Sequence, residues 1–157
     1  MNLASSYAKL DRLLATLGGW LQPLLLLVIR VWWGWSFFQT GKGKLMNLEG
    51  TTEFFASLHI PAPKLNAIVA GSTECFGGLL LLAGLFSRPI AVPLIFTMLV
   101  AYWTNDHAAL VAIFSDTDKF TGATPFLFLF ACLIVFAFGP GPISLDALFF
   151  KKGAAKN

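Results

Sequence analysis

Charged side chains are scarce in this sequence of 157 residues. Asp, Glu, Lys and Arg make up 12% of it, whereas 57% of the residues are hydrophobic. A soluble domain carries roughly 25% charged residues, because water must solvate its surface. The mean hydropathy of +0.73 agrees with this shortage. So few charges exclude an ordinary water-soluble globular domain and favour a protein whose surface faces lipid.

Residues that bind metals or haem are also scarce. The sequence has two cysteines and two histidines, without a CxxC pair or a cluster of zinc or copper spacing. Cys75 and Cys132 lie inside apolar segments, where a cysteine behaves as a small buried hydrophobic residue. His107 lies at the edge of a predicted helix, so it is poorly placed to ligate a haem within a membrane. Neither metal nor haem is therefore expected as a cofactor.

Long apolar segments account for most of the chain. They extend over about residues 18–39, 65–86, 90–105 and 125–139. A helix needs about 20 predominantly apolar residues to span the hydrocarbon core of a membrane. No internal repeat or low-complexity tract divides the sequence. We therefore expect a single all-α domain over residues 1–157, a polytopic membrane protein built as a bundle of four transmembrane helices.

Loop lengths and basic residues predict how these helices are oriented. A very short break joins the second and third spans, whereas the other two connections are long and lie on the opposite side from both termini. The basic residues on the side of the termini are Lys9, Arg12, Arg88, Lys151, Lys152 and Lys156, and those on the other side are Lys42, Lys44, Lys64 and Lys119. The positive-inside rule then places both termini in the cytoplasm of a bacterial inner membrane. The basic residues form no stripe, so nucleic acid is not an expected partner.

Arg30 and Glu74 are expected deep in the membrane. Each lies about twelve residues from the cytoplasmic end of its span, which at 1.5 Å per residue is a depth of roughly 18 Å. Because an isolated charge at the bilayer centre costs at least ~2.5 kcal/mol, we expect the two side chains to form a buried ion pair. Either this pair only fixes the register of the helices, or it holds a polar ligand or passes protons.

A second candidate site is expected where the first and third spans end. Its histidine titrates near neutral pH, and its tryptophans offer flat apolar walls, a combination that suits a quinone head group or another amphiphilic ring. A solvated helix end with an ordinary aromatic belt would explain the same residues without a ligand. The candidate pocket extends from this outer end towards Arg30 and Glu74, and its residues are Trp33, Gly34, Lys44, Gly78, Trp103, Asn105, Asp106 and His107.

Four short stretches between about residues 24 and 148 resemble the DoxX family of membrane proteins. They are residues 30–45, with Arg30 and Gly41-Lys42-Gly43-Lys44-Leu45; residues 60–88, with Glu74-Cys75-Phe76-Gly77-Gly78-Leu79; Met98, Ala101 and His107; and residues 139–146. The resemblance implies a four-helix membrane fold and relatives that are small subunits of quinone-linked oxidoreductases, including the thiosulfate:quinone system. The positions that match the family are Arg30, Lys44, Glu74, Arg88, His107 and Asp146.

Three functions remain open at this point. We expect a small integral membrane subunit of a redox complex, with quinone as the candidate cofactor and a protein partner in the membrane. The first alternative is a non-enzymatic scaffold or assembly partner. The second is a small-solute permease, formed by a homo-oligomer, in which Arg30 attracts an anion. Neither an enzymatic activity nor catalytic residues follow from the sequence.

Overall fold

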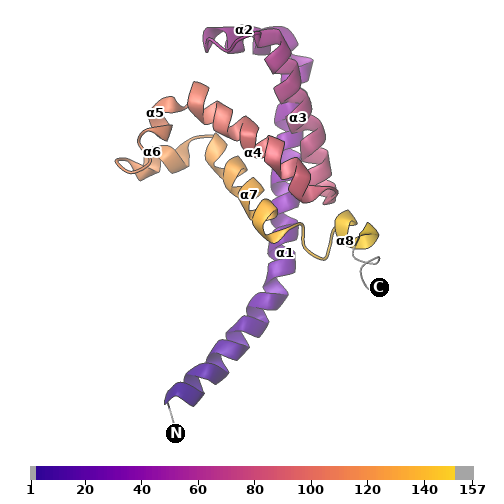
Figure 1. Cartoon of the computed structure of the whole chain (residues 1–157), viewed down its shortest axis with the longest axis vertical. Helices are drawn as coiled ribbons and strands as arrows, with labels where there is room; N and C mark the ends of the chain where they lie inside the picture. The colour runs from indigo at the N-terminus through magenta and orange to yellow at the C-terminus, as the bar shows by residue number, and fades with distance from the viewer. Residues whose placement is uncertain (1–2, 151–157) are drawn as a thin grey trace.

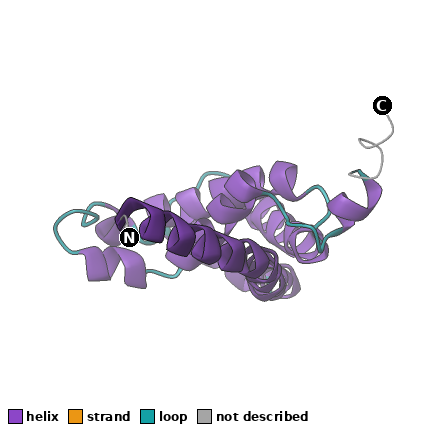
Figure 2. Ribbon diagram, turned by 90° about the horizontal axis from the view of Figure 1, so that it is seen from below, coloured by secondary structure: helices purple, strands orange, loops and turns teal. Residues whose placement is uncertain are grey.

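The computed structural model describes residues 3–150, with side chains from residue 6, and this part of the chain consists of helices and loops without a strand (Figures 1 and 2). The long helices are α1 (Leu3–Met46), α3 (Pro63–Ala83), α4 (Ser87–Thr104) and α7 (Pro125–Phe138). The short helices are α2 (Leu48–Ser57), α5 (His107–Leu110), α6 (Thr117–Gly122) and α8 (Leu145–Phe149). Lys151, Lys152 and Lys156, which entered the orientation argument, lie outside the described residues.

Each predicted span overlaps one long helix, and the helix that contains the first span extends well beyond it at both ends. α1 has 44 residues, because neither Pro23 nor the glycines at 41 and 43 interrupt it. By length and composition, two helices are able to cross a membrane, within residues 6–46 and 63–83. α7 is more apolar than either of them but has only 14 residues. The all-helical fold is thus confirmed.

The long helices alternate in direction along the chain. α1 and α4 finish at the same end of the bundle, where α3 and α7 begin (Figure 1). We call this the Lys44 end. At the opposite end α3 stops at Gly84, whose positive φ of 69° suits glycine, and α4 starts three residues later. We call this the Arg30 end.

Glycines bring α1 and α3 into very close contact. A methyl group at Gly41 would lie 2.6 Å from the carbonyl oxygen of Gly71, and one at Gly34 would lie 2.9 Å from that of Gly78. On each helix the two glycines are seven residues apart, which is about two helical turns and keeps them on one face. Such backbone contact is how helices associate in lipid, where the hydrophobic effect does not drive them together.

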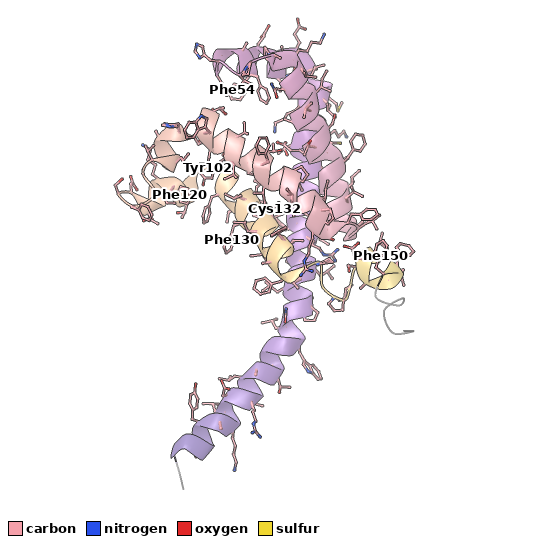
Figure 3. The ribbon with its side chains drawn as sticks, in the orientation of Figure 1. Phe54, Tyr102, Phe120, Phe130, Cys132 and Phe150 are labelled. Atoms are coloured by element: carbon pink, nitrogen blue, oxygen red, sulfur yellow. The ribbon has the colours of Figure 1, made fainter. Side chains whose placement is uncertain are left out.

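The core joins all four long helices. Its fully buried members come from α1 at Phe37, from α3 at Leu81, from α4 at Leu94 and from α7 at Cys132 and Val135 (Figure 3 labels Cys132). Cys75 and Cys132 are free and buried, which confirms their expected role as small hydrophobic residues. The outward faces of the same helices are strongly apolar, with exposed residues that include Val28, Trp32, Phe76, Phe96 and Leu127.

The long connection between α4 and α7 contains α5 and α6 and is fixed to the bundle by Tyr102. The Tyr102 ring stacks on Phe120 with a centroid distance of 5.1 Å, and its hydroxyl donates a hydrogen bond of 2.8 Å to the Phe120 carbonyl (Figure 3). Buried tyrosines usually find such a partner for their hydroxyl. This contact holds the connection beside the Lys44 end, and the end of α4 therefore has a fixed neighbour.

Candidate functional site

Arg30 and Glu74 are both buried, each 1% exposed, but they do not pair with one another. Both carboxylate oxygens of Glu74 accept hydrogen bonds from Lys44 Nζ. Arg30 instead donates from Nη2 to the carbonyl oxygen of Ile143. The expected burial is confirmed, whereas the predicted ion pair between Arg30 and Glu74 is wrong.

The prediction is wrong because it assumed an incorrect register between the first two long helices. It placed the start of the first span, near residue 18, level with the end of the second. In the structure, Arg30 lies opposite the end of α3, where a side chain at Gly84 would collide with its guanidinium. Gly41 lies against the backbone of Cys75, so Glu74 is level with the part of α1 around Gly41. This part is roughly 15 Å further along α1 than Arg30. Lys44, on the last turn of α1, is the basic residue within its reach.

A cavity of about 240 Å³ lies at the Lys44 end, and the Glu74 side chain is part of its wall. Its lining is predominantly apolar and comes from α1 at Thr40, from α2 and the residues after it, from α3, from α4 and the residues after it, and from the start of α7. The lining residues are Thr40, Phe54, Phe55, Leu58, Ile60, Ala70, Glu74, Thr97, Met98, Val100, Ala101, Thr104, Asn105, Asp106, Thr124, Pro125 and Phe128. The cavity therefore combines apolar walls with one buried carboxylate.

Helix α2 closes part of this cavity. The Asn47 side chain caps the helix by accepting a hydrogen bond of 3.3 Å from the Gly50 backbone N–H. Along α2 the apolar Phe55 and Leu58 line the cavity, whereas Glu53 is exposed. In Figure 3 the labelled Phe54 lies on α2, beside the start of α3. The sequence had suggested only a polar loop here, and the apolar residues spaced three apart were the overlooked signal for a helix.

Part of the predicted pocket gathers at this cavity. Asn105 and Asp106 line it from the end of α4, and Lys44 holds the Glu74 carboxylate in its wall. Lys44 is 30% exposed, so it links the buried carboxylate to the surface of the bundle. Within residues 3–150, no three His, Cys, Asp or Glu side chains come together to hold a metal ion. The charged groups at the cavity are thus the buried Glu74 carboxylate, the Lys44 ammonium that binds it and the Asp106 carboxylate.

The other predicted pocket residues lie elsewhere. Gly34 and Gly78 form the contact between α1 and α3, and Trp33 packs edge-on against a phenylalanine of α7, with ring centroids 4.9 Å apart. Trp103 is 67% exposed and His107 is also exposed; their rings meet edge-on with centroids 5.3 Å apart. The positions of Trp103 and His107 agree with the alternative interpretation, in which an aromatic belt surrounds a solvated helix end.

At the Arg30 end, Asp146 joins the segment after α7 to the turn between α3 and α4. Its carboxylate accepts hydrogen bonds from the backbone N–H groups of Phe86, at 2.8 Å, and Ser87, at 3.0 Å. Its own N–H donates to the Gly84 carbonyl at 2.9 Å. The carboxylate thereby caps α4, whose cap residue Phe86 supplies no side-chain hydrogen bond.

The same carboxylate lies near enough for its negative charge to act on Arg30, although no hydrogen bond or ion pair joins the two side chains. The Arg30 guanidinium reaches the same segment through Ile143, and Arg88 donates from Nε to the Phe136 carbonyl at 3.1 Å and from Nη2 to that of Ala137 at 3.2 Å. Arg30, Arg88 and Asp146 therefore tie the end of α7 and the segment after it to the rest of the bundle. The sequence reasoning missed the proximity of Asp146 to Arg30, because the 115 positions between residues 30 and 146 give no sign of it.

A double-mutant cycle should detect the Lys44–Glu74 pair in the protein. We expect Lys44→Met alone to destabilise the fold, because it leaves a buried carboxylate without its partner, and Glu74→Gln to remove most of that loss. The coupling energy should be about 1–2 kcal/mol, measured by unfolding in mixed micelles. The matched cycle of Arg30→Met with Glu74→Gln should show almost no coupling. Strong coupling in this second cycle would restore the pairing that the structure rejects.

Comparison with known proteins agrees with these features. The DoxX family model matches residues 25–107, which include both Arg30 and the Lys44–Glu74 pair. The chain is 35% identical over 134 residues to inner membrane protein YphA of Escherichia coli, covering 80% of this chain and 90% of YphA. It is 31% identical over 125 residues to a Bacillus subtilis protein named "Putative oxidoreductase CatD", covering 80% and 87%. No solved structure matches significantly. The match to the family model and the similarity to both relatives identify this chain as a membrane protein of the DoxX family.

Proposed function

We propose that this protein is a small membrane subunit of a redox complex and that its cavity at the Lys44 end holds the ring of an amphiphilic cofactor, with quinone as the candidate. The observation that carries the proposal is a buried carboxylate, paired with a lysine, in the wall of an otherwise apolar cavity. Burying a charged pair is costly, and in membrane helices it often serves a function.

The size and lining of the cavity fit one ring. Ligand pockets usually measure roughly 300–1,000 Å³, and the volume here is about 240 Å³. A flat ring would pack against Phe55, Met98 and Phe128. The Asn105 amide, which lines the cavity, would donate a hydrogen bond to a ring carbonyl, whereas the Glu74 carboxylate would accept one from a ring hydroxyl. Lys44 binds this carboxylate and is partly exposed, so the pair could move a proton between ring and surface.

The relatives support the class of this proposal. The name of CatD refers to an oxidoreductase and that of YphA to the inner membrane. A redox role for this chain is consistent with both names. The cavity would hold the ring of the cofactor, whereas electron transfer would require a protein partner that carries a redox centre.

The proposal includes four membrane spans, formed by α1, α3, α4 and α7. The 18 residues of α4 and the 14 of α7 correspond to about 27 Å and about 21 Å of helix. A hydrocarbon core of about 30 Å tolerates such short helices by local thinning, because the cost per ångström of mismatch is small. The excess of basic residues at the Arg30 end would place it in the cytoplasm and the cavity towards the outer side.

Quinone binding to the purified protein in lipid nanodiscs tests this function. Titration with a short-chain ubiquinone, followed by native mass spectrometry, should show one ring bound per chain. Glu74→Gln should raise the Kd about tenfold or more, because a hydrogen bond to a charged group contributes about 1.5–3 kcal/mol. Ala101→Leu should also abolish binding, because Ala101 lines the cavity and a larger side chain would fill it. Ala137→Leu, at an exposed position of α7, is the matched control and should bind normally.

Folded wild-type protein that binds no quinone would overturn the proposal. A stable protein partner without any bound small molecule would instead indicate a scaffold or assembly partner. Anion flux into liposomes that disappears in Arg30→Met would indicate a permease.

A further inference from the structure

The first part of α1 extends beyond the bundle. In Figure 1 the indigo N-terminal stretch leaves the other helices at an angle. Side chains from residue 6 to residue 22 are all exposed, and Pro23 lies inside the helix. A proline within a helix removes a backbone hydrogen bond and bends the axis. The stretch touches the bundle only near its end, where Gly18, Leu21 and Gln22 line a shallow hollow with Ile134 and Phe138 of α7.

This stretch has two sharply separated faces. At 100° per residue, all its large apolar side chains fall within an arc of about 140°. They are Tyr7, Leu10, Leu13, Leu14, Leu17, Trp20 and Leu21. The remaining arc carries only polar or small residues, namely Ala8, Lys9, Asp11, Arg12, Ala15, Thr16, Gly18, Gly19 and Gln22. Such a helix is suited to a boundary between an apolar and an aqueous phase.

We infer that residues 6–22 lie along the membrane surface at the Arg30 end, with this apolar face among the lipid acyl chains. The length of α1 supports this location. Its 44 residues extend over about 66 Å, whereas the hydrocarbon core is about 30 Å thick. The residues after Pro23 are enough to cross it, so those before it lie outside the core. The bend at Pro23 lets the helix turn towards the membrane plane.

Charge and aromatic residues also favour the lipid surface. Lys9 and Arg12 against Asp11 leave a net positive polar face, which anionic lipid head groups attract. Trp20 is 83% exposed and lies just before the bend, at the level where tryptophans collect in membrane interfaces. Beyond the bend the exposed apolar residues continue at Val28 and Val31, so the lipid-facing surface of α1 is continuous.

A coiled coil with a second copy is the competing occupant. Tyr7, Leu10, Leu14, Leu17 and Leu21 alternate at spacings of three and four, as the a and d positions of a heptad do. In a dimer the flanking e and g positions usually carry paired charges. Here the g positions are large and apolar, at Leu13 and Trp20. The resulting face is wider than a dimer seam and favours lipid.

Spin labels on the full-length protein in phosphatidylethanolamine and phosphatidylglycerol vesicles test this inference. A label is attached to Leu14→Cys or to Thr16→Cys, which lie on opposite faces of the helix. The native Cys75 and Cys132 are buried, so the wild-type background should take up little label. We expect the ratio of oxygen to nickel-chelate accessibility to be severalfold higher at position 14 than at position 16. Phe96→Cys serves as the lipid reference and Asp118→Cys as the aqueous one, because both positions are exposed.

Two outcomes would overturn the inference. Equal nickel-chelate access at positions 14 and 16 would mean that the helix projects into water. Dipolar broadening at position 14 that disappears on dilution with unlabelled protein would indicate a coiled coil between copies. Both readouts are independent of quinone binding, so they do not depend on the proposed function.

Discussion

Gly41→Ala is expected to separate α1 from α3 and to destabilise the protein strongly. The new carbon would lie 2.6 Å from the Gly71 carbonyl oxygen and 2.8 Å from the Cys75 Cα. Both neighbours are backbone atoms of a helix, so neither can move aside as a flexible side chain would. The whole helix must shift, and the glycine contact further along, between Gly34 and Gly78, is loosened with it.

The size of this effect follows from two opposing terms. Alanine is a better helix former than glycine by about 1 kcal/mol, which favours the variant. Overpacking usually costs about 1–3 kcal/mol, and a collision with rigid backbone belongs at the upper end. We expect a net loss of about 2 kcal/mol or more, measured by unfolding in mixed micelles with increasing sodium dodecyl sulfate. The folded yield in membranes should fall in parallel.

Gly43→Ala is the matched control for this variant. Gly43 lies on the same helix, and a methyl group there would meet no atom within 4 Å. The control should be as stable as the wild type or slightly more stable, because only the helix propensity changes. If Gly41→Ala behaves like this control, the close contact between α1 and α3 does not exist in the protein.

Asp146→Ala should produce the second large effect, at the other end of the bundle. The change removes the acceptor of two backbone N–H groups at the start of α4 and the charge that acts on the buried Arg30. A hydrogen bond to a charged group contributes about 1.5–3 kcal/mol, and the buried guanidinium of Arg30 also loses a nearby negative charge. We expect a destabilisation of about 3 kcal/mol and an opening of the turn between α3 and α4. Hydrogen exchange of the amides of Phe86 and Ser87 would report this opening directly.

Asp116→Ala separates helix capping from the buried charge. Asp116 caps α6 by accepting a hydrogen bond of 3.0 Å from the Lys119 N–H, but it is exposed and has no buried arginine to balance. Losing such a cap costs about 1 kcal/mol. Equal losses for Asp116→Ala and Asp146→Ala would show that Asp146 acts only as a helix cap and does not balance the charge of Arg30.

Local sequence patterns predicted several residues of the candidate site, but they did not show which of these residues lie together. Lys44, Glu74, Asn105 and Asp106 were singled out from the sequence, and the structure brings them to one cavity. They had been assigned to two separate sites, since Glu74 was paired with Arg30. Helix α2, which closes part of the cavity, was missed, because its ten residues were interpreted as part of a long connection. Without this helix the sequence predicted an outer mouth rather than a cavity.

The sequence by itself determined that this protein belongs in a membrane, that it is helical and that Arg30 and Glu74 are buried. These properties depend on composition and on apolar segments, and a charge within such a segment must turn away from lipid. Only the tertiary structure decided which partners the two charges have. Helical periodicity shows which face of a helix is buried, but it does not show how far one helix is shifted along another. Here the contacts of Gly34 and Gly41 with α3 set that shift, and they place Glu74 beside Lys44 rather than Arg30.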